Sequence, residues 1–171
     1  MYRRYLAGWH VAVPFIITFI LFTAVIFKYL LPEVEERLIA ERKRETQEHV
    51  QIVMALLGDH LEEVKKGRMS LEEAQESAKN HIRQLRFGAQ NKNYFWVSDI
   101  NAFMLVHPYT PAMEGKSQFN YQDTDGRYIF REFASVAREK KEGFVSYRWQ
   151  HMDNPGILAE KTSFIELFEP W

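Results

Sequence analysis

The side chains best suited to binding a ligand lie in four short runs of aromatic and β-branched residues in the second half of the chain. The runs cover residues 94–98, 103–107, 143–150 and 159–168. Their composition is typical of strands, and successive side chains of a strand point to opposite faces of a sheet. If the faces of the four runs coincide, tyrosine, tryptophan, histidine and lysine side chains converge on one side of a sheet.

In each of four sets, the side chains are expected to share one face of their strand. They are Tyr94 with Trp96, Phe103 with Leu105 and His107, Tyr147 with Trp149, and Lys161 with Ser163. Aromatic rings exclude water, and a charge-assisted hydrogen bond from lysine or arginine then holds an anion in place. The pattern therefore predicts an aromatic cage with one cation, which suits a small carboxylate.

Each of these residues also has a plain structural interpretation. A tyrosine or tryptophan on a strand is commonly part of the core, and Lys161 on an edge can keep its ammonium group in water. His107 precedes Pro108 and so can simply end its strand. The conjunction of these residues, rather than any one of them, indicates a ligand site.

Metal chemistry has weaker support. Asp123-Thr-Asp-Gly126 with Glu132 partly matches a calcium loop, but Tyr121 stands at the first ligand position. A turn at the entry to a helix explains the same residues, with aspartate as a cap and glycine in the turn. The six histidines form no i, i+4 pair and no His-x-x-Glu-His arrangement, so we expect no metal site.

Enzymatic chemistry has no motif in this sequence. It contains no Gly-x-Ser-x-Gly, no phosphate-binding glycine loop and no dinucleotide fingerprint. No nucleophile stands at a recognisable spacing from a base and an orienting group. With no cysteine, the chain has no disulfide scaffold, thiolate zinc site or cysteine nucleophile. We therefore expect neither an enzyme nor a cofactor.

The charge balance separates two segments of the chain. The 22 Lys and Arg residues nearly equal the 23 Asp and Glu residues, which argues against a nucleic-acid partner. The first 32 residues hold Arg3, Arg4 and Lys28 and no acid, so the remainder is mildly acidic. Such a surface would not attract organic anions at long range, and affinity would come from local groups such as Lys161.

An apolar segment near the N-terminus predicts a transmembrane helix at residues 5–31. The 23 positions between Arg4 and Lys28 carry no formal charge. At about 1.5 Å per residue they span roughly 34 Å, enough for a hydrocarbon core of about 30 Å. A cleaved signal peptide would have a shorter apolar region followed by small residues, whereas bulky Ile26, Phe27 and Tyr29 stand there.

The charges that flank this helix predict its orientation. Arg3 and Arg4 precede it, and Glu33, Glu35 and Glu36 follow it closely. By the positive-inside rule, residues 1–4 lie in the cytoplasm. Everything after Pro32 is then expected outside the inner membrane.

Residues 32–86 are expected to form a helical hairpin. A long helix continues from the membrane segment, with an apolar stripe at Val50, Val53, Leu57, Leu61 and Val64. Gly67 is a plausible C-cap, and Ser70 with Glu73 matches a capping box. The second helix should bury Leu71, Ala74, Ala78, Ile82 and Leu85. The charged first half of the long helix is read as a solvated face, with contacts in a dimer as the alternative.

Residues 87–171 are expected to form a small antiparallel sheet on this hairpin. Turns are predicted at residues 99–102 and 153–156, and a helix at about 127–141 crosses between the second and third strands. Four strands and one crossing helix indicate an α+β fold.

Several of these motifs together resemble a known family. They are Leu85-Arg-Phe-Gly88, Asn93-Tyr-Phe-Trp-Val97, His107-Pro108, Met113-Glu-Gly-Lys116, Asp123-Thr-Asp-Gly126, Gly143-Phe-Val-Ser-Tyr-Arg-Trp149 and Lys161-Thr-Ser-Phe164. In order and spacing they resemble a bacterial single Cache domain, the PAS-like extracytoplasmic sensor of chemoreceptors and sensor kinases. The resemblance covers the chain from about Glu33 to its end.

The resemblance implies a pocket in the PAS-like sheet for acids such as acetate, propionate, pyruvate or lactate. Its motifs point to candidate pocket residues Arg86, Tyr94, Trp96, His107, Tyr147 and Lys161, with Trp149 added from its strand face. Met113 and the loop at Gly115 and Lys116 would form a lid. Strand alternation and resemblance agree at Tyr94, His107, Tyr147 and Lys161.

The resemblance also implies a longer receptor. Family members continue past residue 171 into a final strand, a second membrane helix and a cytoplasmic output region for chemotaxis, phosphorylation or cyclic-dinucleotide chemistry. A sheet without that strand has an unpaired edge, so we expect this chain to be a fragment.

These observations predict an extracytoplasmic ligand-sensing input module of a membrane receptor. A small organic acid would displace strands and helices and so signal across the membrane. The alternative is a ligand-free, membrane-anchored dimerisation or scaffold module. In either case a homodimer through the charged helix at residues 33–48 is expected.

Overall fold

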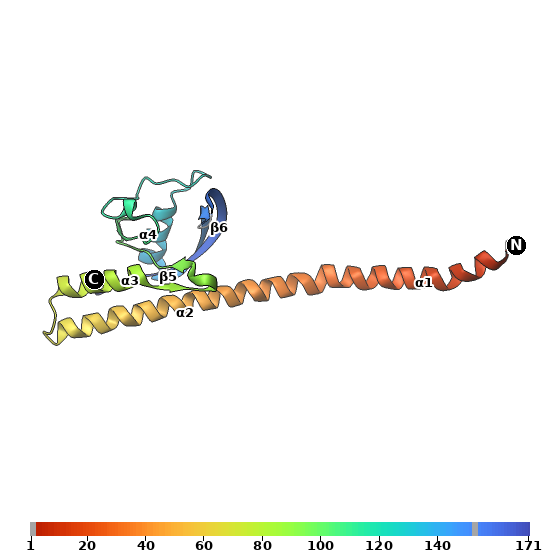
Figure 1. Ribbon diagram of the computed structural model, residues 1–171, viewed down its shortest axis with the longest axis horizontal. Helices are drawn as coiled ribbons and strands as arrows, with labels where there is room; N and C mark the ends of the chain where they lie inside the picture. The colour runs from red at the N-terminus through yellow and green to blue at the C-terminus, as the bar shows by residue number, and fades with distance from the viewer. Residues whose placement is uncertain (1–2, 152–153) are drawn as a thin grey trace. The chain divides into compact units, whose positions relative to one another are not determined.

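The computed structural model describes residues 3–151 and 154–171 (Figure 1). Met1 and Tyr2, part of the predicted cytoplasmic segment, and Asp153, part of a predicted turn, lie outside the described residues. The chain divides into two compact units, one up to Arg44 and one from Glu45 to Trp171. Each unit is described by itself.

The first unit is helical and exposes its apolar side chains. Helix α1 (Arg3–Val25) leads through a π-helical turn (Ile26–Leu30) into α2 (Leu31–Lys65). Phe15 is 75% exposed and Phe19 70% exposed. Within the described residues, one helix is long and apolar enough to cross a membrane, and no membrane surrounds it here.

A helical hairpin opens the second unit, as predicted. Helix α2 ends in a turn in which Gly67 has φ 68° and Arg68 N–H donates to the Glu63 carbonyl at 3.0 Å. Helix α3 (Leu71–Gln84) begins with the predicted capping box of Ser70 and Glu73. It buries Ala74, Ala78 and Ile82, but Leu71 is 46% exposed because it stands at the first helical position, next to the turn.

The strands form three antiparallel pairs. Strand β1 (Arg86–Phe87) pairs with β2 (Asn93–Tyr94), β3 (Val97–Ser98) with β4 (Met104–Val106), and β5 (Glu142–His151) with β6 (Asn154–Glu166). Helix α4 (Ile129–Lys140) precedes β5 and confirms the predicted crossing helix.

The predicted α+β fold with antiparallel strands is thus confirmed, but within the described residues the strands form separate pairs and not one four-stranded ladder. The run 94–98 was expected to be one strand, but it changes partners midway. Tyr94 pairs with Arg86 of β1, whereas Val97 pairs with Val106 of β4. Phe95 and Trp96 lie between these two short strands, so the run cannot belong to one ladder.

Strand alternation holds in the long ladder and in β4, but it does not extend to His107. On β5, Val145 and Tyr147 are buried and Ser146 is exposed, as alternation requires. On β4, Met104 and Val106 are fully buried while Leu105 is 37% exposed. The expectation that Phe103, Leu105 and His107 share a face therefore fits Phe103 and Leu105, which are both exposed, and is wrong only for buried His107. His107 lies beyond the end of β4, and the turn into Pro108, not the strand pleat, buries it.

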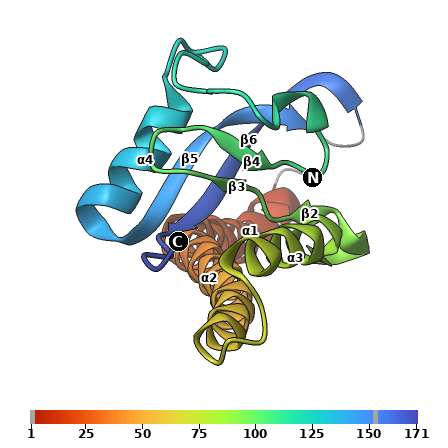
Figure 2. The same ribbon diagram turned by 90° about the vertical axis from the view of Figure 1, so that its left-hand side faces the viewer.

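Two apolar clusters hold these elements together. Beneath α4, Ile129, Phe130 and Phe133 pack with Tyr147 and Ile165 of the β5–β6 ladder. The second cluster joins the hairpin to β3 and β4 through Val53, Ile82 and Val106. Figure 2 shows the strand pairs between α4 on one side and the hairpin on the other. The strands that carry the candidate site are thereby supported by helices from two directions.

The turn before α4 is a hydrogen-bonded loop. Asp123 Oδ1 accepts hydrogen bonds from the N–H groups of Asp125 (3.0 Å) and Arg127 (2.9 Å), which is the turn chemistry favoured over a calcium loop. Helix α4 begins two residues later, and Tyr128 at its N-cap makes no side-chain capping bond. Over the described ranges, no group of three or more His, Asp or Glu residues is arranged to hold a metal ion.

Candidate functional site

Lys161 is the unusual side chain of the second unit. The β5–β6 register places it opposite Tyr147, and its Nζ lies 4.1 Å from the centroid of the Tyr94 ring. Burial lowers the pKa of Lys161 from 10.5 to about 8. Among the residues that the structure describes, no carboxylate lies within 4.0 Å of this amino group. Lys161 is half-buried, and a cation partly removed from water without an anionic partner is costly, so the site is suited to receiving an anion.

The Tyr94 ring belongs to a series of four rings, each of which contacts the next. The centroid of the Tyr94 ring lies 5.2 Å from that of His107, which lies 5.8 Å from that of Trp149. The Trp149 ring in turn lies 6.1 Å from Tyr147. These four rings and Lys161 are termed the cage below. Its members come from β2, the end of β4, β5 and β6, so no single element builds it.

The cage presents neutral hydroxyl groups. Tyr147 Oη lies 2.9 Å from Ser163 Oγ, and burial raises the pKa of Tyr147 to about 12. Burial also raises the pKa of Tyr94. Both phenols therefore keep their protons at neutral pH and can donate hydrogen bonds.

His107 is a neutral donor with a defined tautomer. The Thr110 N–H donates to His107 Nδ1 at 2.9 Å, so Nδ1 carries no proton and the neutral ring carries it on Nε2. Nε2 makes a long contact, 3.5 Å, with Tyr94 Oη. Burial, and next the charge of Lys161, lower the pKa of His107 to about 4. At neutral pH, the cage thus combines one ammonium group with an imidazole N–H.

A cavity of about 550 Å³ borders the cage. Tyr94, Trp96, Lys161 and Ser163 line it on one side. Val53 and Leu57 of α2 and Ile82 of α3 are among the apolar residues of its other walls. Each residue of β6 from Lys161 to Glu166 lines this cavity, so it runs along the strand's edge and not along one face only. The cavity therefore gives the cage an apolar approach.

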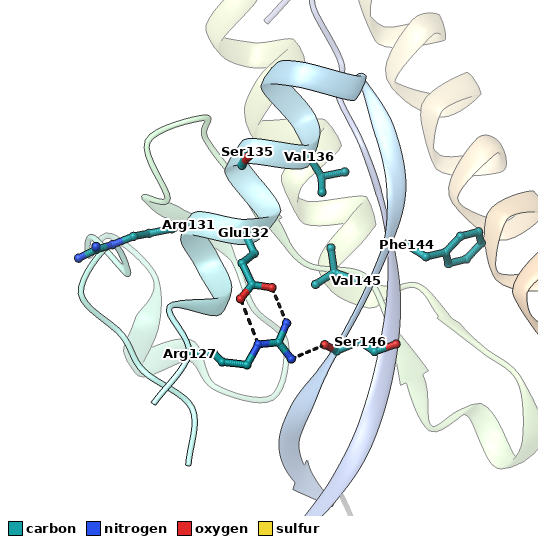
Figure 3. Close-up of a pocket in the computed structure, with 8 residues that line it drawn as sticks. All are labelled: Arg127, Arg131, Glu132, Ser135, Val136, Phe144, Val145 and Ser146. Atoms are coloured by element: carbon teal, nitrogen blue, oxygen red, sulfur yellow. Dashed lines mark hydrogen bonds and ion pairs between the residues drawn. The ribbon is translucent and has the colours of Figure 1, made fainter. Parts of the chain in front are cut away.

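A second hollow lies between α4 and β5 (Figure 3). It is lined by Arg127, Arg131, Glu132, Ser135, Val136, Phe144, Val145 and Ser146. Its charges are already paired, because Arg127 binds Glu132 and donates to the Ser146 carbonyl at 2.9 Å. The Arg131 guanidinium lies over the Tyr128 ring, 3.7 Å from its centroid, and donates to the Phe119 carbonyl. Because its charges are already paired, this hollow is a poorer candidate for binding a charged ligand than the cage is.

The structure brings together five of the eight residues predicted for the site: Tyr94, His107, Tyr147, Trp149 and Lys161. Trp96 lines the neighbouring cavity, but its ring packs against Phe133 at 4.9 Å. Met113 is buried in the core beneath α4. It is covered by core side chains and so does not line the cavity beside the cage.

Arg86 contacts the cage indirectly, through the ring of Tyr109. Its guanidinium is 4.9 Å from the centroid of the Tyr109 ring and donates to Tyr109 Oη at 3.1 Å. It also donates to the main-chain carbonyls of Arg83 and Leu85. The Tyr109 ring contacts Tyr94 edge to face at 4.8 Å. Arg86 therefore supports the cage through Tyr109 and does not enter it.

Sequence reasoning missed three residues around the cage. Tyr109 packs on Tyr94, and Tyr121 packs on Trp149 at 5.6 Å. Glu114 accepts a hydrogen bond from the His107 N–H at 2.8 Å. All three lie in the long loop between β4 and α4, where no periodicity indicates which side chains turn inward. The one available signal was Tyr109 itself, an aromatic residue directly after the His107-Pro108 motif.

Comparisons with family models and with individual proteins point to the same family. The model of the family described as single Cache domain 2 matches residues 38–171. The methyl-accepting chemotaxis protein McpP of Pseudomonas putida is 31% identical over 144 residues, which are 83% of this chain and 26% of McpP. The sensor histidine kinase MctS of Rhizobium johnstonii is 30% identical over 78 residues, 46% of this chain and 16% of MctS. This chain thus spans about a quarter or less of these relatives.

Solved structures share the fold. A periplasmic sensor domain of a chemotaxis protein has a TM-score of 0.74 at 30% identity, over 79% of this chain and 92% of that one. A Cache chemosensory domain, described for its recognition of carboxylic acids, has a TM-score of 0.72 at 34% identity, over 80% of this chain and 90% of that one. A methyl-accepting chemotaxis protein of Vibrio parahaemolyticus, 18% identical, has a TM-score of 0.69 over 82% of this chain and 89% of that one.

Proposed function

This chain belongs to the single Cache domain 2 family of sensor domains, and on that premise we propose that it binds a small organic carboxylate in the cage. One observation carries the proposal: Lys161 is half-buried over the Tyr94 ring and has no carboxylate partner in the described part of the chain. A bound carboxylate would supply the missing negative charge. The carboxylic acids recognised by a Cache domain 34% identical to this chain support the same ligand class.

Each cage residue has a role in this binding. The Lys161 ammonium pairs with the carboxylate, and the His107 Nε2–H and the tyrosine hydroxyls donate hydrogen bonds to its oxygens. The Trp149 ring excludes water, which strengthens these interactions.

The sensor is anchored in the inner membrane in this proposal. The apolar residues of α1 are exposed as they would be in lipid, and the helical backbone continues from Arg3 to Lys65. The arginines at positions 3 and 4 favour a cytoplasmic N-terminus and a periplasmic sensor domain. Ligand binding would shift the strands of the cage against the hairpin and so pass a signal towards the membrane.

Calorimetric titration of the full chain in lipid nanodiscs tests the ligand class. Acetate, propionate, pyruvate and lactate are the probes, and propionamide is the matched control with the shape of propionate but no charge. We expect at least one acid to bind and propionamide to give no signal. If the folded protein bound none of the four acids, or bound propionamide as tightly as propionate, the carboxylate proposal would fail.

A second candidate is a dimerisation module without a ligand. It is favoured by apolar side chains exposed on the first unit's part of α2, where Val34 is 46%, Leu38 58% and Ile39 48% exposed. The chain has no cysteine, so a single Leu38→Cys substitution gives a unique crosslinking site. Efficient disulfide formation at that site, together with no binding of any acid, would favour this candidate. Dimerisation combined with acid binding would favour a homodimeric sensor.

A further inference from the structure

Glu114 joins three parts of the second unit through a single carboxylate. Its Oε1 accepts the His107 N–H at 2.8 Å, and its Oε2 pairs with Arg83 Nη2 of α3 at 2.9 Å. Its side chain is 21% exposed. Burial opposes its charge, but the Arg83 hydrogen bond and the His107 N–H hold the pKa of Glu114 below its usual value. The carboxylate is therefore ionised at neutral pH and engages both partners through charge-assisted hydrogen bonds.

The loop that carries Glu114 is itself well ordered by main-chain hydrogen bonds. Gly115 N–H donates to the Met104 carbonyl at 2.9 Å, and Met104 N–H donates to the Lys116 carbonyl at 3.0 Å. Glu114 N–H donates to the Pro111 carbonyl at 3.0 Å. The loop thus folds back along β4 and places Glu114 beside the end of that strand. Its carboxylate has a defined position from which to reach α3.

The partner on α3 is equally constrained. Arg83 Nη1 donates to Asn80 Oδ1 at 2.8 Å, and the Arg83 carbonyl accepts from Arg86 at 2.8 Å. Glu114 therefore connects the main chain at His107 to a side chain that is fixed on the hairpin. The His107 ring is oriented separately by Thr110, so His107 is held at its main chain and at its ring.

We propose that Glu114 is a positioning residue for ligand binding: it holds the His107 N–H and, through Arg83, couples the cage to α3. This inference rests on the proposed carboxylate site, because His107 is one of its donors. Movement of His107 on ligand binding would then be felt at α3 through the Glu114–Arg83 pair. The pair is a defined physical link between the site and the hairpin.

Two substitutions break the bond between Glu114 and Arg83 while leaving an acceptor for the His107 N–H. Glu114→Gln keeps an oxygen that can accept the His107 N–H but removes the charge that pairs with Arg83. Arg83→Met removes the α3 partner and leaves Glu114 in place. We expect each to weaken propionate binding about tenfold, within the usual range for coupled sites. The double variant should be no weaker than either single one, because both break the same link.

Hydrogen exchange supplies the readout that a purely structural role would not change. In the unaltered protein, saturating propionate should slow amide exchange in the cage strands and at residues 80–84 of α3. In Glu114→Gln at equal saturation, protection should persist in the strands and disappear from α3. Glu63→Gln breaks an exposed pair with Arg68 in the α2–α3 connection and serves as the control that should behave like the unaltered protein.

The outcomes distinguish this inference from the proposed function. If both variants lowered the melting temperature but left affinity and the α3 protection unchanged, Glu114 would be structural and the inference wrong. Additive losses of affinity in the double variant would also overturn it. If the unaltered protein bound none of the four acids, the proposed function would fail; if it bound one of the others but not propionate, that acid would replace propionate in these measurements. If it bound propionate with protection confined to the strands, only the coupling would fail.

Discussion

Replacing Lys161 with methionine should remove carboxylate binding without destabilising the fold. The pKa of Lys161 falls from 10.5 to about 8 because burial disfavours its charged form. At about 1.4 kcal/mol per pKa unit, holding the ammonium group in the folded state costs about 3 kcal/mol. The sign follows from proton binding: below pH 8 the cost is fully present, and it is relieved as pH rises from 8 to 10.5.

Methionine has a similar length and no charge, so it removes this cost. The lost contact with the Tyr94 ring offsets part of the gain, by about 1 kcal/mol. The ligand-free variant should therefore be more stable by about 1 to 2 kcal/mol at pH 7. For a chain of this size that corresponds to a melting temperature higher by a few degrees.

Propionate binding should become weaker, and its change in free energy should be larger than the gain in folding stability. Removing one partner of a buried ion pair typically costs about 3 to 5 kcal/mol. At about 1.4 kcal/mol per decade, propionate affinity should fall by about 100- to 4,000-fold.

The assay pairs calorimetric titration of propionate with thermal unfolding, both at pH 7. Lys65→Met is the matched control, because Lys65 is exposed and pairs with Glu62 on α2. It should change neither quantity appreciably. Unchanged propionate affinity in Lys161→Met would refute the role of the buried charge. A parallel loss of affinity and stability would make Lys161 a structural residue instead.

Three further predictions follow from the protonation and hydrogen bonding of the cage. Propionate affinity should fall about tenfold per pH unit above pH 8, where Lys161 loses its proton, and a flat titration between pH 7 and 10 would contradict this. His107 should destabilise the fold as pH falls from 6.5 to 4, by about 3 kcal/mol in all, because its pKa is lowered to about 4. Urea unfolding of His107→Gln should therefore lose less stability over that range than the unaltered protein, and equal losses would show that other groups are responsible. Tyr147→Phe removes the hydrogen bond to Ser163 and should cost about 1 kcal/mol, whereas Ser146→Ala, which breaks an exposed bond to Thr162, should cost less in the same unfolding assay.

The elements that follow from local rules were predictable from the sequence. The capping box at Ser70 and Glu73 and the turn at Gly67 define the hairpin through residues within a few positions of one another. On the β5–β6 ladder, alternation predicted that Tyr147 shares a face with Trp149 and Lys161 with Ser163, and the register of the ladder then sets Tyr147 opposite Lys161. That ladder is long and regular, so each side chain's face follows from its position.

The short strands were not predictable in the same way. The run 94–98 looks like one strand, yet Tyr94 and Val97 pair with different partners. Partner choice depends on where β1 and β4 lie, which no local pattern encodes. The loop residues Tyr109 and Glu114 escaped prediction for a related reason, since a loop has no repeat to show which side chains turn inward.

By itself, the sequence determined the inventory: an uncharged apolar segment, a capped helical hairpin, and aromatic strands with a lysine at position 161. The tertiary structure alone decided that Lys161 lies over the Tyr94 ring, that His107 carries its proton on Nε2, and that Glu114 links His107 to α3. These contacts join separately packed elements. Their energies depend on distance, burial and the absence of a competing charge, which arise only when the elements pack together.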